Sequence, residues 1–96
     1  MTAGQESLAD LRAAIDGIDR DLVALLAKRV GCLEKVIAVK ARDNLPAAIP
    51  ERVEAVVANV RSEAEAAGMP PDLAETLWRA LIDWSIAYEE KRLHNR

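Results

Sequence analysis

The chain is poor in the residue types that carry metal, covalent and disulfide chemistry. Its 96 residues include one cysteine, one histidine, one tyrosine, two tryptophans and no phenylalanine. The single cysteine, Cys32, excludes an internal disulfide and is typical of a reducing, cytoplasmic protein. Cys32 and His94 are too far apart in sequence to suggest a metal cluster or a nucleophile–base pair. Catalysis would therefore depend on positioned charges and hydrogen bonds, and we expect no metal and no other cofactor.

Charge and hydropathy exclude further classes of protein. A net charge of −3 predicts no general nucleic-acid surface. No apolar run approaches the length of a membrane span, and the first ten residues lack the pattern of a signal peptide. We therefore expect one small cytoplasmic domain, residues 1–96 with its core at about 7–93, which binds neither nucleic acid nor membrane.

One amphipathic stretch, Ser7 to about Arg42, dominates the sequence. Ser7 is a natural N-cap, and Asp10 three residues later completes a capping box. Alternating steps of three and four residues then reach apolar side chains, with Arg29 the exception: Leu8, Leu11, Ile15, Ile18, Leu22, Leu25, Cys32, Val36 and Val39. This period predicts one helix, roughly 52 Å long. A compact domain of this size is only about 30–35 Å across, so we expect the uncovered stripe to pair with a second copy in a homodimer.

Two shorter helices are expected after this stretch. Residues 44–49 form a short loop, and Pro50 suits the first turn of a second helix that ends at Gly68. Asp72 provides a box-like start for a third helix that runs to about Leu93. Because no segment shows a strand pattern, the sequence predicts an all-α subunit of three helices.

Cations on the long helix indicate an anion site. Arg29 and Lys40 are eleven residues apart, almost three helical turns, so they share one face with Cα atoms about 16 Å apart. The gap between their long side chains suits a compact dicarboxylate. Arg12 falls roughly 100° round the helix, but in an antiparallel dimer it could enter the pocket of the partner.

The two shorter helices supply further candidates. Ser85 and Glu89 are one turn apart beside the apolar line of the third helix. A carboxyl group on such a face should be partly desolvated, which favours its neutral, hydrogen-bond-donating form. Glu51, in the first turn of the second helix, is the remaining candidate.

Each of these residues also has a purely structural interpretation. Arg29 could extend to solvent or pair at an interface. Lys40 and Glu51 could complement helix dipoles. Glu89 could be solvated or bind a cation on its own helix, and Cys32 could simply fill the core. No single residue decides between the interpretations.

Taken together, these residues resemble the all-helical (AroQ-type) chorismate mutase family, which includes the isochorismate-pyruvate lyases. The resemblance is carried by LADLRAAIDGIDRDLVALLAKR (8–29), the lysine at 40, IPERVEAVV (49–57) and LIDWSIAYEE (81–90). It implies an intertwined homodimer of three-helix subunits with two shared active sites. The implied substrate is chorismate or isochorismate.

The resemblance also implies roles for the three cations. Arg29 matches an arginine that binds a substrate carboxylate within its own chain, and Arg12 matches the arginine that the partner contributes. Lys40 matches the lysine near the ether oxygen and a carboxylate. Chorismate rearranges to prephenate in one pericyclic step, so the protein has to hold the compact conformer and stabilise charge on the ether oxygen.

Glu51, Ser85 and Glu89 match other pocket positions of the family. Glu51 matches the glutamate that holds the substrate hydroxyl, and Ser85 matches a pocket serine. Glu89 stands where the family often has glutamine to bind the ether oxygen. A glutamate can donate there only when it is protonated, so we expect activity to fall as the pH rises.

The loop at residues 44–49 departs from many mutases. It is short and apolar, and Pro50 stands where an arginine is common. This loop looks more like the lyase branch, which eliminates pyruvate to give salicylate. The sequence therefore predicts a chorismate mutase, with isochorismate-pyruvate lyase as the alternative. A non-catalytic dimerisation or ligand-sensing module is the alternative of another class.

Overall fold

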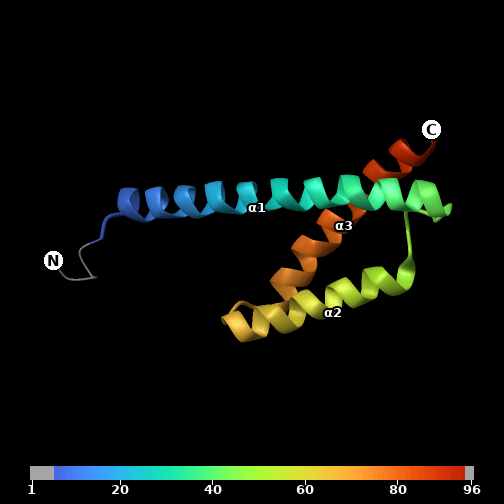
Figure 1. The fold of residues 1–96 in the computed structure, drawn as a ribbon. Helices are drawn as coiled ribbons and strands as arrows, with labels where there is room; N and C mark the ends of the chain where they lie inside the picture. The colour runs from blue at the N-terminus through green and yellow to red at the C-terminus, as the bar shows by residue number, and fades with distance from the viewer. Residues whose placement is uncertain (1–5, 95–96) are drawn as a thin grey trace. The chain divides into compact units, whose positions relative to one another are not determined.

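The computed structural model describes residues 6–94, which form three helices and no strand. They are α1 (Leu8–Asp43), α2 (Pro50–Ala67) and α3 (Pro71–His94) (Figure 1). The predicted all-α class is therefore confirmed. Residues 1–5 and 95–96 of the expected domain lie outside the described residues. The chain divides into two compact units, one up to Glu34 and one from Lys35 onward, and each is described by itself.

Helix α1 begins and ends where local hydrogen bonds fix it. Asp10 N–H donates to Ser7 Oγ at 3.0 Å, and Ser7 N–H donates to Asp10 Oδ2 at 3.3 Å, so the predicted capping box is present. At the other end Asn44 takes the left-handed φ of 58°. Leu45 N–H then donates to the Lys40 carbonyl at 2.8 Å, which satisfies a carbonyl of the last turn.

The ends of α2 are likewise determined by backbone geometry and local hydrogen bonds. Ile49 is extended, with φ −125° and ψ 99°, as a residue before proline must be. Pro50 then opens the helix, as predicted. Gly68 stops it in the left-handed region at φ 77°, and Met69 N–H donates to the Ala64 carbonyl at 2.8 Å. The predicted boundary at Gly68 is confirmed.

Helix α3 begins at Pro71, ahead of the capping residue that the sequence predicts at Asp72. The Pro70 carbonyl accepts the N–H groups of Leu73 and Ala74 at 3.1 and 3.3 Å, and the helix starts at Pro71. Asp72 therefore lies inside the first turn instead of capping it. Its carboxylate binds Arg61 of α2 at 3.0 Å. The predicted cap at Asp72 was wrong because Pro71, whose fixed φ suits the first helical position, already opens the helix and places Asp72 in its first turn.

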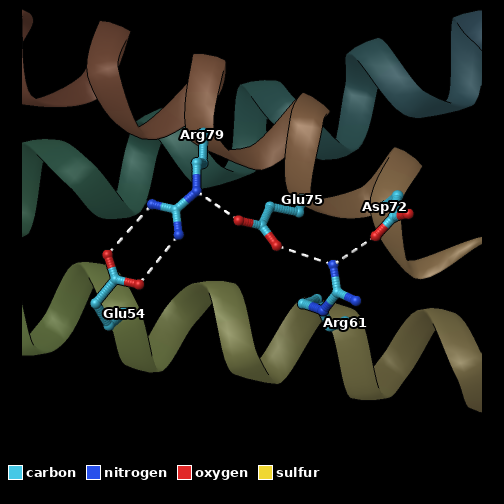
Figure 2. A network of polar contacts seen from close by, with 5 residues as sticks. All are labelled: Glu54, Arg61, Asp72, Glu75 and Arg79. Atoms are coloured by element: carbon cyan, nitrogen blue, oxygen red, sulfur yellow. Dashed lines mark hydrogen bonds and ion pairs between the residues drawn. The ribbon is translucent and has the colours of Figure 1, made fainter.

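A chain of ion pairs joins α2 to α3 along their exposed side (Figure 2). Arg79 binds Glu54 at 3.0 Å and Glu75 at 2.7 Å, and Arg61 binds Glu75 at 2.9 Å and Asp72 at 3.0 Å. Hydrogen bonds from Arg79 lower the pKa of both Glu54 and Glu75. These alternating charges connect the exposed sides of α2 and α3, where each pair contributes little stability by itself.

The core of the second unit is small and mostly aliphatic. Its buried apolar side chains come from all three helices and from the loop: Ile37, Ala47, Val57, Ala64, Ala74, Ile82 and Leu93. Two polar side chains, Ser85 and Glu89, are buried with them at 6% and 5% exposure. A buried carboxyl group needs a hydrogen-bond or ion-pair partner, and the partner of Glu89 belongs to the candidate site described below.

The apolar stripe of α1 is largely exposed in the single chain. Leu8 is 62% exposed and Ile18 is 58% exposed, and Leu11, Ile15, Leu22 and Leu25 are comparable. Cys32 is also exposed, so its expected place in the core was wrong. Among the described residues, no helix is long and apolar enough to cross a membrane.

Candidate active site

A buried ion pair links the last turn of α1 to α3. Lys40 Nζ lies 2.8 Å from Glu89 Oε1, with side-chain exposures of 13% and 6%. The burial expected for Glu89 is confirmed, and its partner is Lys40, not a cation of its own helix. Because desolvating two charges costs much of what their attraction returns, such a pair is weak evidence for a stabilising role. Because both residues also line a cavity, the pair is a candidate functional site.

The loop between α1 and α2 supplies a second partner for the lysine. Lys40 Nζ donates to the Ala47 carbonyl at 2.8 Å. An ammonium group has three N–H donors, so these contacts occupy two of them and leave one for a ligand. Lys40 is therefore held from two sides, by a carboxyl group and by a backbone carbonyl.

A cavity of about 80 Å³ adjoins this pair. Polar groups and aliphatic side chains line it together: Lys40, Ala47, Ile49, Arg52, Val53, Val56, Ile82, Ser85, Ile86 and Glu89. Ligand pockets usually measure roughly 300 Å³ or more. This cavity alone can therefore enclose only part of a ring-sized ligand.

Ser85 and Glu51 differ in their relation to the cavity. Ser85 lines it, as expected, and Ser85 Oγ donates to the Leu81 carbonyl at 2.8 Å. Glu51 is exposed and is not among the lining residues, because the first turn of α2 directs the opposite side of the helix toward the cavity. Its predicted contact with substrate has no support in this cavity.

Arg52 lines the cavity although it is not among the residues that the sequence predicts. Helical spacing could have identified it. Ile49, Arg52, Val53 and Val56 follow the i, i+3, i+4, i+7 pattern of one helix face, and all four line the cavity. An arginine therefore lines the cavity two residues after Pro50, the position at which an arginine is common in the family that the sequence resembles.

Arg12 and Arg29 belong to the first unit. Arg12 is exposed and Arg29 is half-buried. Their contribution to this cavity, one from the same chain and one from a partner, stays a prediction.

The sequence matches known proteins over most of its length. A family model described as chorismate mutase type II matches residues 11–90. The chain belongs to this family. All six predicted site residues and Arg52 lie within the matched segment.

The curated relatives of this chain differ in length: some are about four times as long as this chain, and one has nearly the same length. A T-protein from Enterobacter agglomerans is 42% identical over 85 residues, which cover 88% of this chain and 23% of the relative. A bifunctional chorismate mutase/prephenate dehydratase from Aquifex aeolicus is 27% identical, over 90% of this chain and 25% of the relative. The chain thus spans about a quarter of the length of these two relatives.

A third relative has nearly the same length as this chain. It is an isochorismate pyruvate lyase from Pseudomonas aeruginosa, 38% identical over 88% of this chain and 82% of the relative. Both reactions anticipated from the sequence are therefore represented among its relatives.

Proposed function

We propose that this chain converts chorismate to prephenate in a charged pocket that two copies share. The observation that carries the proposal is the buried pair of Lys40 and Glu89 beside an apolar cavity, in a member of the chorismate mutase type II family. Well-packed apolar residues often stabilise a core as well as a buried ion pair does. A binding function therefore explains the pair better than stability does.

The proposed reaction suits a site without a nucleophile. Within one molecule of chorismate the ether C–O bond breaks and a C–C bond forms, and no group enters or leaves. The Lys40 ammonium donates to the ether oxygen as negative charge collects there. Glu89, when protonated, donates to the same oxygen through its second carboxyl oxygen. Arg29 and Arg52 are suited to bidentate binding of the two substrate carboxylates.

A second copy completes the proposed site. The cavity of a single chain is too small for the whole substrate, and the apolar stripe of α1 is exposed in the single chain. A homodimer would cover that stripe and bring Arg12 of one copy to the pocket of the other.

A cytoplasmic location, expected from the lone cysteine, belongs to the same proposal.

Turnover of chorismate by the purified chain tests this function. We expect saturable loss of chorismate with formation of prephenate. We expect Lys40→Met to abolish it at a temperature where circular dichroism shows that the variant is still helical. Lys35→Met is the matched control, because it removes an exposed lysine from the same helix. Equal activity in the Lys40 and Lys35 variants would contradict the proposed role of Lys40.

Isochorismate-pyruvate lyase is the second candidate function. The relative from Pseudomonas aeruginosa supports it, and so does the short apolar loop, residues 44–49, that contacts Lys40. Isochorismate offered in parallel should then release salicylate, which is followed by its fluorescence. A dimer that binds chorismate without converting either compound would instead indicate the non-catalytic, ligand-sensing module.

A further inference from the structure

We infer that the backbone carbonyl of Ala47 is a positioning group for the catalytic lysine, so that residues 44–49 set the place of the Lys40 ammonium in the site. This inference rests on the proposed function of Lys40. It assigns a task to the loop that neither its apolar composition nor its length indicates.

The loop is tied to Lys40 at two points. Leu45 N–H donates to the Lys40 main-chain carbonyl at 2.8 Å, and the Lys40 ammonium donates to the Ala47 carbonyl at 2.8 Å. Asn44, directly before the first of these loop residues, takes a left-handed φ of 58° at the end of α1. The main-chain carbonyl of Lys40 therefore binds the loop, and the loop in turn binds the side chain of Lys40.

Ala47 is the one buried residue of this loop. It is 8% exposed, whereas Leu45, Pro46 and Ala48 are exposed. The ring of Pro46 fixes the φ angle of the residue directly before Ala47. The small side chain of Ala47 lets the main chain lie against the cavity, which Ala47 lines. The carbonyl is thus presented by a stiff, close-packed segment.

The two acceptors of Lys40 differ in an important respect. The Glu89 carboxyl group lies at the end of a side chain that can rotate toward the substrate, whereas the Ala47 carbonyl belongs to the main chain and cannot. When Glu89 donates to the ether oxygen, as proposed, Ala47 remains the fixed partner of the ammonium. Catalytic groups depend on such placement, because an error of about 1 Å can cost on the order of 100-fold in rate.

A backbone ester tests the carbonyl without changing a side chain that carries chemistry. In a chain assembled by chemical ligation, Ala48→lactic acid turns the Ala47 carbonyl into an ester carbonyl, a weaker acceptor. Within the described part of the chain the Ala48 N–H donates no hydrogen bond, so the ester removes no donor that is in use. The matched control is Ala47→lactic acid, which converts the Pro46 carbonyl and leaves the Ala47 carbonyl an amide.

We expect the ester at Ala48 to lower kcat by about tenfold with little change in KM, because transition-state placement is lost more than substrate binding. The ester at Ala47 should stay within about twofold of the all-amide chain. The Lys40 ammonium resonance in ¹⁵N-resolved NMR should shift or broaden in the first ester only. Equal kcat values and equal Lys40 resonances in the two esters would overturn the inference.

A genetically encoded pair covers the case in which an ester fails to fold. Pro46→Gly loosens the loop that carries Ala47, and Pro70→Gly loosens the other turn. We expect only Pro46→Gly to lower kcat and to alter the Lys40 resonance. If the all-amide chain converts neither chorismate nor isochorismate, the proposed function fails, while an unchanged resonance in the loop variants would separately refute the positioning contact.

Discussion

Replacing Lys40 by methionine leaves the Glu89 carboxyl group in the core with no cation beside it. Methionine fills most of the same volume, so the change removes the charge and its two hydrogen bonds more than it removes packing. The reverse change, Glu89→Leu, leaves the ammonium with the Ala47 carbonyl alone. The double replacement removes both charges together.

The expected magnitudes follow from burial of the pair. With side-chain exposures of 13% and 6%, each single replacement should cost about 3–5 kcal/mol in free energy of unfolding, as for other buried pairs that lose one partner. Lys40→Met also leaves the Ala47 carbonyl without its donor, which adds about 1–3 kcal/mol unless water reaches it. The double replacement should cost only about 1–3 kcal/mol, from the unpaired Ala47 carbonyl. Because that cost also occurs in Lys40→Met and cancels, the pair should show a coupling energy of at least about 6 kcal/mol.

Urea unfolding followed by tryptophan fluorescence measures these differences, at one fixed protein concentration because the proposed dimer makes stability concentration-dependent. Arg42→Met is the control, since its contact with Asp43 is exposed and its loss should barely move the midpoint. Single replacements that each cost less than about 1 kcal/mol and simply add in the double variant would refute the buried-pair interpretation.

Three further predictions concern catalysis, assembly and pH. Glu89→Gln should retain turnover of chorismate, because an amide N–H can donate to the ether oxygen, whereas Glu89→Leu should lose it; equal turnover in the two variants would remove Glu89 from the mechanism. Mixed Arg12→Ala and Lys40→Met chains, each inactive alone, should recover about one quarter of parental activity on subunit exchange, since half of the dimers are mixed and each has one intact site; no recovery would contradict a shared site. The arginine between Glu54 and Glu75 holds both pKa values below their ordinary 4.5, so the stability they contribute is complete above about pH 4.5 and is lost as the pH falls through the lower folded values. Thermal unfolding of Glu54→Gln/Glu75→Gln should accordingly depend less on pH between about 5 and 3 than that of the parent, and an unchanged dependence would exclude these carboxylates as its source.

The helices could be predicted because their signals are local. Ser7 with Asp10, Pro50 and Gly68 each define a boundary through backbone geometry within a few residues, and all three boundaries are as expected. The start of α3 was misplaced because the box-like pattern at Asp72 was followed instead of Pro71, which is the first residue of the helix. The contact of Asp72 with Arg61 lies between two helices, and local sequence patterns carry no information about such a contact.

The site was predictable only in part, for a related reason. Periodicity and family resemblance identified Lys40, Ser85 and Glu89 as pocket residues, and the structure places all three around one cavity. They did not indicate that Lys40 and Glu89 bind each other across 49 positions of sequence. The contact of Lys40 with Ala47 was beyond reach, since a backbone carbonyl leaves no mark in the sequence. Arg52 was recoverable from helical spacing.

Initial rates of chorismate loss with the purified chain, measured against increasing chorismate and beside the Lys40→Met variant, are the decisive measurement. We expect a saturable rate with prephenate as product in the parent chain, and only the spontaneous rate in the variant. A parent chain that shows no saturable loss of chorismate, or a variant that matches it, would contradict a mutase site built on Lys40.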